Sequence, residues 1–158
     1  MANRYLLPVY NTLYGKSFSY SNFDQRMEMQ KAVYLLQDMG VPVGDYGFRW
    51  YQHGPYSQCL QDDMHYENSR SFAALTLPKE YADSISLLHD VIHSPERGNY
   101  SVAHWVECLA SLHYLHDNVL RFNATEDEVV AALEKRKPHL NDHSTNISAY
   151  RLVEGLFS

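Results

Sequence analysis

Histidine is the residue type in this chain that most readily suggests chemistry. The 158-residue sequence contains nine histidines, and a neutral imidazole serves as a metal ligand or an acid–base group. His89 and His93 are four positions apart, and His113 and His116 are three apart, so each pair can share one helical face. A zinc site needs further ligands with supporting partners, and the sequence has neither an HExxH motif nor a Cys–His cluster. We therefore expect polar and interfacial histidines, with no metal and no cofactor.

The two cysteines offer a second route to chemistry. Cys59 and Cys108 form no CxxC motif, which argues against a disulfide framework or a zinc ribbon. Cys59 lies near an expected helix start with His53 close in sequence, where a helix dipole can lower the pKa of a thiol. Cys108 lies in an apolar stripe, where we expect a small buried hydrophobe. A small enzyme built on Cys59 or on the histidine pairs is therefore an alternative, although no motif names a reaction and no catalytic residue is predicted.

Charge and motif content exclude several function classes. The formal net charge is −6, which disfavours general binding to phosphate backbones. Neither GxxxxGK[ST] nor GxGxxG occurs, so nucleotide hydrolysis and dinucleotide redox chemistry have no support. A local positive surface that would suit DNA could still be formed by Arg4, Arg26, Lys31, Arg49 and the segment 134–139. The cations of that segment also suit the carboxyl end of a helix, which explains them without DNA.

The elements that must position these residues are mainly helical. Apolar spacing predicts helices over about 5–14, 22–39, 79–93, 101–118 and 125–137. A short helix is expected to start at Pro55 with Ser57 as a cap, and a last one at Ser144 or Asn146. Thr125 and Glu128 form a capping-box pattern, and a polar loop is expected around 68–71. We predict one mainly α domain over residues 1–158, with about six helices and a winged-helix-like N-terminal half, in which helix 101–118 packs on helix 23–39.

Between those helices, residues 41–51 predict a small strand or wing that is rich in aromatic residues and closed by Gly54 and Pro55. One short hairpin cannot hide so many rings, so one or two should be exposed as anchors for a partner, unless a helix covers them as an aromatic minicore. Asp62 and Asp63 are expected to face solvent beside them as an acidic contact surface. The residues predicted to bind a partner are Phe48, Trp50, Tyr51, Tyr56, Asp62 and Asp63.

Several segments also carry a family resemblance. Residues 26–37 (RMEMQKAVYLLQ), 46–51 (YGFRWY) and 54–57 (GPYS) resemble the YwgA-like proteins and the related Panacea (SocA-like antitoxin) domains, and residues 134–140 (EKRKPHL) resemble their later KP segment. The polar run 62–67 departs from the family pattern. The resemblance implies a helical, winged-helix-like domain that acts through protein contacts as an antitoxin or a proteolytic adaptor, and it carries over no catalytic residues.

These observations predict a non-catalytic protein-binding module of antitoxin or adaptor type in a prokaryotic or mobile-element cytoplasm. Its partner would be a protein, either toxin-like or a client delivered to a protease. A winged-helix-like DNA-binding regulator is the alternative, and that function would require a homodimer. No apolar run approaches the ~20 residues that a membrane helix needs, and the amino terminus lacks the pattern of a signal peptide. We therefore expect no contact with a membrane.

Overall fold

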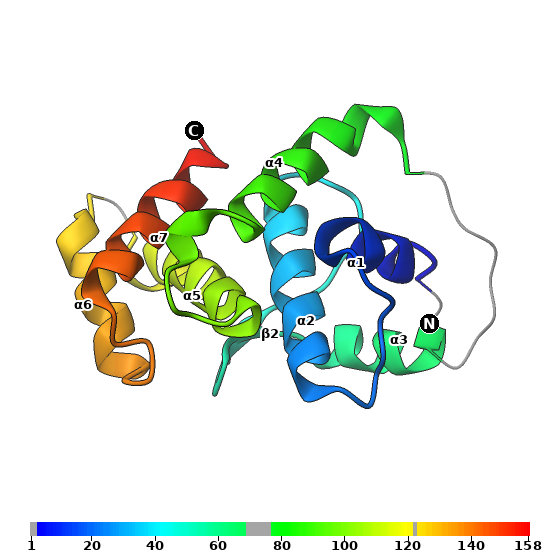
Figure 1. The fold of residues 1–158 in the computed structure, drawn as a ribbon, viewed down its shortest axis with the longest axis horizontal. Coiled ribbons are helices and arrows are strands. Elements are labelled where there is room, and N and C mark those ends of the chain that lie inside the picture. The colour runs from blue at the N-terminus through cyan, green and yellow to red at the C-terminus, as the bar shows by residue number, and fades with distance from the viewer. Residues whose placement is uncertain (1–2, 69–76, 122) are drawn as a thin grey trace.

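The structure is a computed structural model that describes residues 3–68, 77–121 and 123–158. Within these ranges the chain is mainly α-helical with one two-stranded antiparallel sheet, as predicted (Figure 1). The elements are α1 (Leu6–Tyr14), α2 (Phe23–Asp38), β1 (Arg49–Tyr51), β2 (Gly54–Tyr56), α3 (Gln58–Asn68), α4 (Ala82–Ile92), α5 (Val102–Tyr114), α6 (Glu126–Arg136) and α7 (His143–Gly155). Short 3-10 turns cover Lys79–Tyr81 and Pro95–Arg97, and a π-helix covers Leu115–Leu120.

Helices α2 and α5 pack against each other at the centre, which confirms the predicted pairing. Helices α1, α3 and α4 lie on the α2 side, and α6 and α7 lie on the α5 side (Figure 1). Trp105 of α5 is completely buried and donates from its indole nitrogen to the Val91 carbonyl over 2.9 Å, which ties α5 to α4. Among the described helices, none is long and apolar enough to cross a bilayer.

Local sequence signals fix several helix starts. Asn22 caps α2 by accepting from the Gln25 amide over 3.1 Å. The capping box at α6 is complete, because the Thr125 amide donates to Glu128 over 2.9 Å and the Glu128 amide donates to Thr125 Oγ1 over 3.2 Å. The predicted single helix 101–118 instead changes from α5 into the π-helix at Leu115.

Two element boundaries were predicted wrongly. Gly54 and Pro55 form β2 and pair with Tyr51 and Trp50 of β1, so the turn lies at Gln52 and His53. A sheet of two strands consists of edges only, and an edge tolerates a proline. The short helix α3 therefore starts after Ser57, whose hydroxyl caps it.

The other wrong boundary is the start of α7, which Asp142 caps from outside the predicted range. Asn146, one of the two predicted caps, is buried inside the helix and accepts a hydrogen bond from the Tyr100 hydroxyl over 2.8 Å. The predicted polar loop around 68–71 lies outside the described residues except for Asn68.

A buried histidine joins the two halves of the fold. His113 of α5 contacts Asp38 of α2 (2.9 Å), Asp117 (3.3 Å) and Glu154 of α7 (3.0 Å), and its ring stacks on Phe157. Burial by itself lowers the pKa of His113, but the hydrogen bonds and charges of the carboxylates outweigh burial and raise that pKa to about 9. The imidazolium therefore ties α2 and α7 to the central helix.

This contact predicts a pH-dependent stability. The folded-state pKa of about 9 exceeds the usual 6.5, so the stabilisation is complete below about pH 6.5 and is lost as pH rises through about 9. We expect the free energy of unfolding, measured in urea across this range, to fall by on the order of 3 kcal/mol through this group. The variant His113→Gln should lack that fall, whereas the exposed control His143→Gln should keep it. Parallel pH curves for wild type and His113→Gln would contradict the assignment.

Candidate functional site

The segments that carry the family resemblance meet in space around the hairpin. Gln30 of α2 makes two hydrogen bonds with Ser57: its side-chain nitrogen donates to the Ser57 carbonyl over 2.8 Å, and its oxygen accepts from the Ser57 amide over 2.9 Å. The neighbouring Lys31 donates to the Pro55 carbonyl over 2.6 Å. Side chains of α2 thus provide hydrogen-bond partners for backbone groups in and next to β2, where a two-stranded sheet has no further strand.

A second lysine holds the other side of the hairpin. Lys137 follows α6, and its ammonium donates to the carbonyls of Gln52 and Tyr51. The same ammonium lies 5.0 Å from the centre of the Trp50 ring, within the range of a cation–π contact. The KP segment therefore fixes the turn of the hairpin and the ring beside it.

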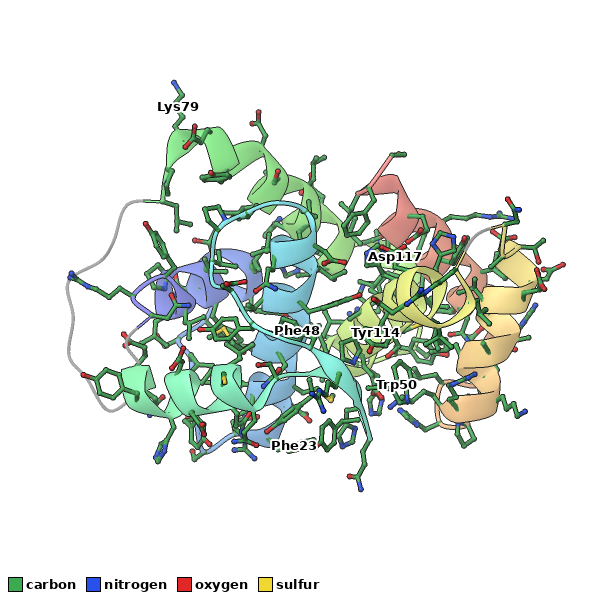
Figure 2. All side chains as sticks on the ribbon, turned by 180° about the vertical axis from the view of Figure 1, so that it is seen from behind. Phe23, Phe48, Trp50, Lys79, Tyr114 and Asp117 are labelled. Carbon is green, nitrogen blue, oxygen red and sulfur yellow. The ribbon has the colours of Figure 1, made fainter. Side chains whose placement is uncertain are left out.

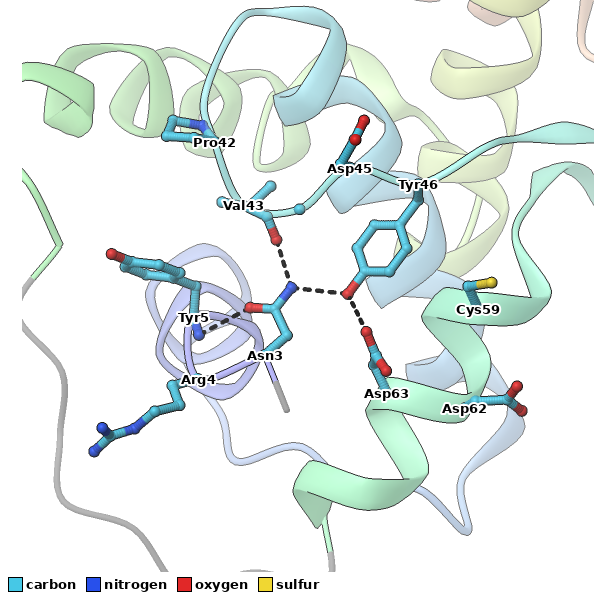
Figure 3. Close-up of a pocket in the computed structure, with 11 residues that line it drawn as sticks. Asn3, Arg4, Tyr5, Pro42, Val43, Asp45, Tyr46, Cys59, Asp62 and Asp63 are labelled. Carbon is cyan, nitrogen blue, oxygen red and sulfur yellow. Dashed lines mark hydrogen bonds between the residues drawn. The ribbon is translucent and has the colours of Figure 1, made fainter. Parts of the chain in front are cut away.

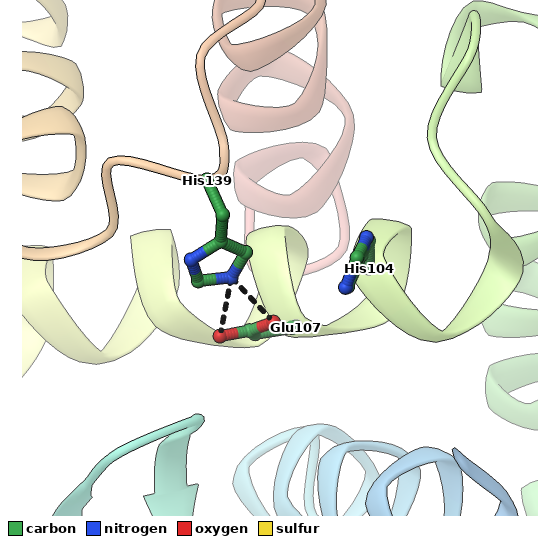
Figure 4. A group of neighbouring side chains, drawn as sticks. All are labelled: His104, Glu107 and His139. Atoms are coloured by element: carbon green, nitrogen blue, oxygen red, sulfur yellow. Dashed lines mark hydrogen bonds and ion pairs between the residues drawn. The ribbon is translucent and has the colours of Figure 1, made fainter.

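Glu107 of α5 pairs with Lys137 and also acts electrostatically on Lys31. It is completely buried, and its Oε2 lies 3.3 Å from Lys137 Nζ. His139 Nε2 lies 3.1 Å from Oε1, and His53 Nδ1 lies 3.9 Å from Oε2. Figure 4 shows His139 pointing at this carboxylate, with His104 one turn away on the same helix. Glu107 therefore connects the central helix to the hairpin and to the segment after α6.

The charges in this cluster are unequal. Burial lowers the pKa of Lys31 to about 7, against the attraction of Glu107, and the nearby Lys137 lowers it further. Burial also lowers the pKa of Lys137, and that of His53. One buried carboxylate thus faces two buried lysines, and the cluster keeps a positive excess whenever both lysines are protonated.

The aromatic residues of the hairpin divide into two groups. Phe48 packs edge-on against Tyr34, with ring centres 5.2 Å apart, and Trp50 packs against Tyr114 at 5.7 Å (Figure 2). Both are half-buried and serve as the predicted minicore. Tyr51 is 58% exposed and makes an edge contact with the half-exposed Tyr56 at 5.1 Å.

Phe23 extends this exposed group, and the sequence prediction missed it. It opens α2, is 49% exposed, and packs edge-on against His53 with ring centres 5.1 Å apart. Phe23, Tyr51, His53 and Tyr56 together are called the hairpin face below. Phe23 lies before the buried stripe of α2, and this position indicates that its ring points outward. No local sequence pattern indicated that the ring would lie beside His53.

The predicted acidic residues lie in a separate hollow of about 820 Å³ between α1, α3 and the segment before β1 (Figure 3). Asp62 is exposed there, but Asp63 is only 9% exposed and accepts from the Tyr46 hydroxyl over 2.7 Å. The prediction that Asp63 faces solvent is therefore wrong, because it holds Tyr46 in place. Cys59 is exposed in the same hollow, which has no described His or Lys in its lining.

Groups of metal-ligand type occur at two places in the described residues. His104, Glu107 and His139 place one atom each within 4.8 Å, and so do the residues around His113, in the two groups Asp38–His113–Asp117 and His116–Asp117–Glu154. The pair His113 and His116, chosen by its spacing, does converge, because both contact Glu154. The pair His89 and His93 stacks at 4.3 Å, but His93 Nε2 lies 2.6 Å from the Leu13 carbonyl, which accounts for its position.

The structure also shows where Cys108 and two of the cations proposed for a DNA surface lie. Cys108 is completely buried, as expected, and its thiol donates to Asn146 over 3.4 Å. Burial raises the pKa of that thiol, which disfavours the reactive thiolate form. Of the cations proposed for a DNA surface, Lys31 and Lys137 are buried and occupied by hairpin carbonyls. The positive surface is therefore smaller than the sequence suggested.

No protein-family model matches the chain, and no curated protein or solved structure matches it either. The resemblance to the YwgA-like and Panacea families therefore stays a prediction from the motifs. The function has to be argued from the contacts themselves.

The buried position of Lys31 predicts how its replacement acts. Its folded-state pKa of about 7 is below the usual 10.5, so the unfolded chain holds this proton more tightly and the folded chain is penalised below about pH 7. We expect Lys31→Met to gain stability relative to wild type at low pH, by on the order of 3 kcal/mol more at about pH 6 than at about pH 10. Urea unfolding at both pH values measures this difference.

The exposed Lys135 provides the control for that experiment. Lys135→Met should show no comparable change between the two pH values. If Lys31→Met changed the free energy of unfolding by the same amount at low and high pH, the lowered pKa of the buried Lys31 would be contradicted.

Proposed function

We propose that this chain is a non-catalytic protein-binding module and that the hairpin face is its contact surface. The observation that carries the proposal is a ring that is 58% exposed, Tyr51, on a hairpin whose backbone is held by two buried lysines. Aromatic residues dominate the energetics of protein interfaces, and a ring pays less entropy on binding when its backbone is already fixed.

The construction of the hairpin supports this function more than a catalytic one. A two-stranded hairpin alone is marginally stable. Here the side chains of Gln30, Lys31 and Lys137 donate hydrogen bonds to carbonyls in the hairpin and at Ser57 beside it. Trp50 fills the space beneath it and leaves Tyr51 on the outer side. The two residues are adjacent in a strand, where successive side chains point to opposite faces. The hairpin thus presents one ring while it buries the next.

The resemblance to the Panacea domains supports the narrower proposal of an antitoxin or adaptor, which acts by occupying a toxin-like protein or by delivering a client to a protease. A DNA-binding regulator is the second proposal. It is supported by the exposed Arg49 on β1 and by Lys135 and Arg136 at the end of α6. The net charge of −6 and the burial of two candidate cations weigh against it.

The proposal predicts the outcome of an affinity capture from source cells with the tagged chain. We expect wild type to retain a protein at constant stoichiometry, and Tyr51→Ala combined with Phe23→Ala to lose it. Truncation of two such anchors is expected to weaken binding by on the order of a hundredfold or more. Isothermal titration with the purified partner gives the affinity.

The matched control is Leu87→Ala, because Leu87 is 55% exposed on α4, away from the hairpin. Circular dichroism and thermal unfolding establish that each variant is folded. Equal capture by wild type and the double variant would remove the hairpin face from the proposal. Recovery of DNA with a steep salt dependence, and of no protein, would favour the regulator.

A further inference from the structure

Two hollows open beside the hairpin face. One, of about 350 Å³, is lined by Lys31, Tyr51, Gln52, His53 and Tyr56. The other, of about 200 Å³, lies towards the start of α2 and adds Arg26 and Phe23 to its lining. Lys31, His53 and Tyr56 line both, so the hollows are neighbours that share a wall. One hollow is smaller than the roughly 300–1,000 Å³ of small-molecule pockets and the other is at the low end of that range, so each is large enough for a side chain of a partner.

The residue types that line these hollows differ from the acidic balance of the whole sequence. The sequence carries 19 acidic residues against 13 Lys and Arg, yet no described Asp or Glu lines either hollow, whereas Arg26, Lys31 and His53 do. The Arg26 guanidinium lies over the Phe23 ring at 5.6 Å and donates from Nη1 to the Tyr20 carbonyl, so its position is fixed and its other donors are available. Glu107, which interacts electrostatically with Lys31 and His53, is buried and already contacts Lys137 and His139.

We propose that this pair of hollows binds a carboxylate side chain of the partner, presented on an acidic peptide segment that also carries an aromatic or apolar residue. The proposal rests on the proposed function, since it names the chemistry of the segment that the hairpin face would contact. A carboxylate entering here meets the Arg26 guanidinium, and the His53 ring and the buried Lys31 amine belong to the same lining. The rings of Phe23, Tyr51 and Tyr56 provide apolar walls for the neighbouring residue.

Charge complementarity selects this occupant over a basic one. A Lys or Arg of a partner would be placed near the Arg26 guanidinium, with no described carboxylate in the lining to balance it, and like charges brought together are costly. A basic partner segment would instead suit the separate hollow that contains Asp45, Asp62 and Asp63. The sequence prediction placed the acidic partner surface beside the aromatic turn, but these two features belong to different hollows.

The test uses the full chain as bait for a random displayed peptide library. Peptides that need the hairpin face are those that bind wild type and Leu87→Ala but not Tyr51→Ala. We expect this class to be enriched in Asp and Glu, with an aromatic or large apolar residue close by. For the strongest peptide, replacing its acidic residues with Gln or Asn should weaken binding about tenfold or more, measured by fluorescence polarisation.

Protein variants provide the matched half of the test. Arg26→Gln should weaken the acidic peptide several-fold while leaving its Gln counterpart unchanged, and the exposed Lys135→Gln should weaken neither. Enrichment of Tyr51-dependent peptides without any acidic preference would overturn this inference and leave the proposed function standing. Absence of any Tyr51-dependent peptide would overturn both. Loss of binding in Lys135→Gln to the same extent would show that general charge attraction, and not this site, is responsible.

Discussion

The structure around the hairpin depends on the burial of Glu107 between cationic groups from different parts of the chain. A buried carboxylate is costly unless it is paired, and here Lys137 and His139 from the segment after α6 pair with it directly, while His53 from the hairpin turn and Lys31 from α2 lie around it. Both lysines donate to hairpin carbonyls. One charge on the central helix thus brings three distant segments to one place.

This arrangement explains why such a small sheet persists. Three residues in each strand bury little surface, and a hairpin of that size does not form a stable unit alone. The polar contacts from Gln30, Lys31 and Lys137 fix its backbone, and Trp50 fills the space above Tyr114. The motif segments that looked like a signature are therefore first of all the parts that build the hairpin. Their functional consequence is indirect, since a fixed hairpin presents Tyr51 and encloses the hollows beside it.

The same cluster determines the electrostatics of the surface. In an acidic chain the hollows beside the hairpin have basic side chains in their lining, Arg26 and Lys31, and no described acidic one. The His113 cluster on the other side of α5 has the opposite balance, with carboxylates from α2, the π-helix and α7 around one imidazolium. The central helix thus carries one cluster of each sign, and both tie outer elements to it.

The sequence by itself determined the helices, because apolar periodicity and capping are local: the capping box at Thr125 and the buried stripe of α5 both occur as predicted. It also determined that an aromatic hairpin lies between them. Only the tertiary structure decided which rings are exposed, that Asp63 is occupied by Tyr46, and that Lys31 and Lys137 are interior groups. The physical reason is that burial and pairing of a polar side chain depend on residues up to about a hundred positions away, such as Glu107 for Lys31 and Gln52 for Lys137, and no local pattern records those partners.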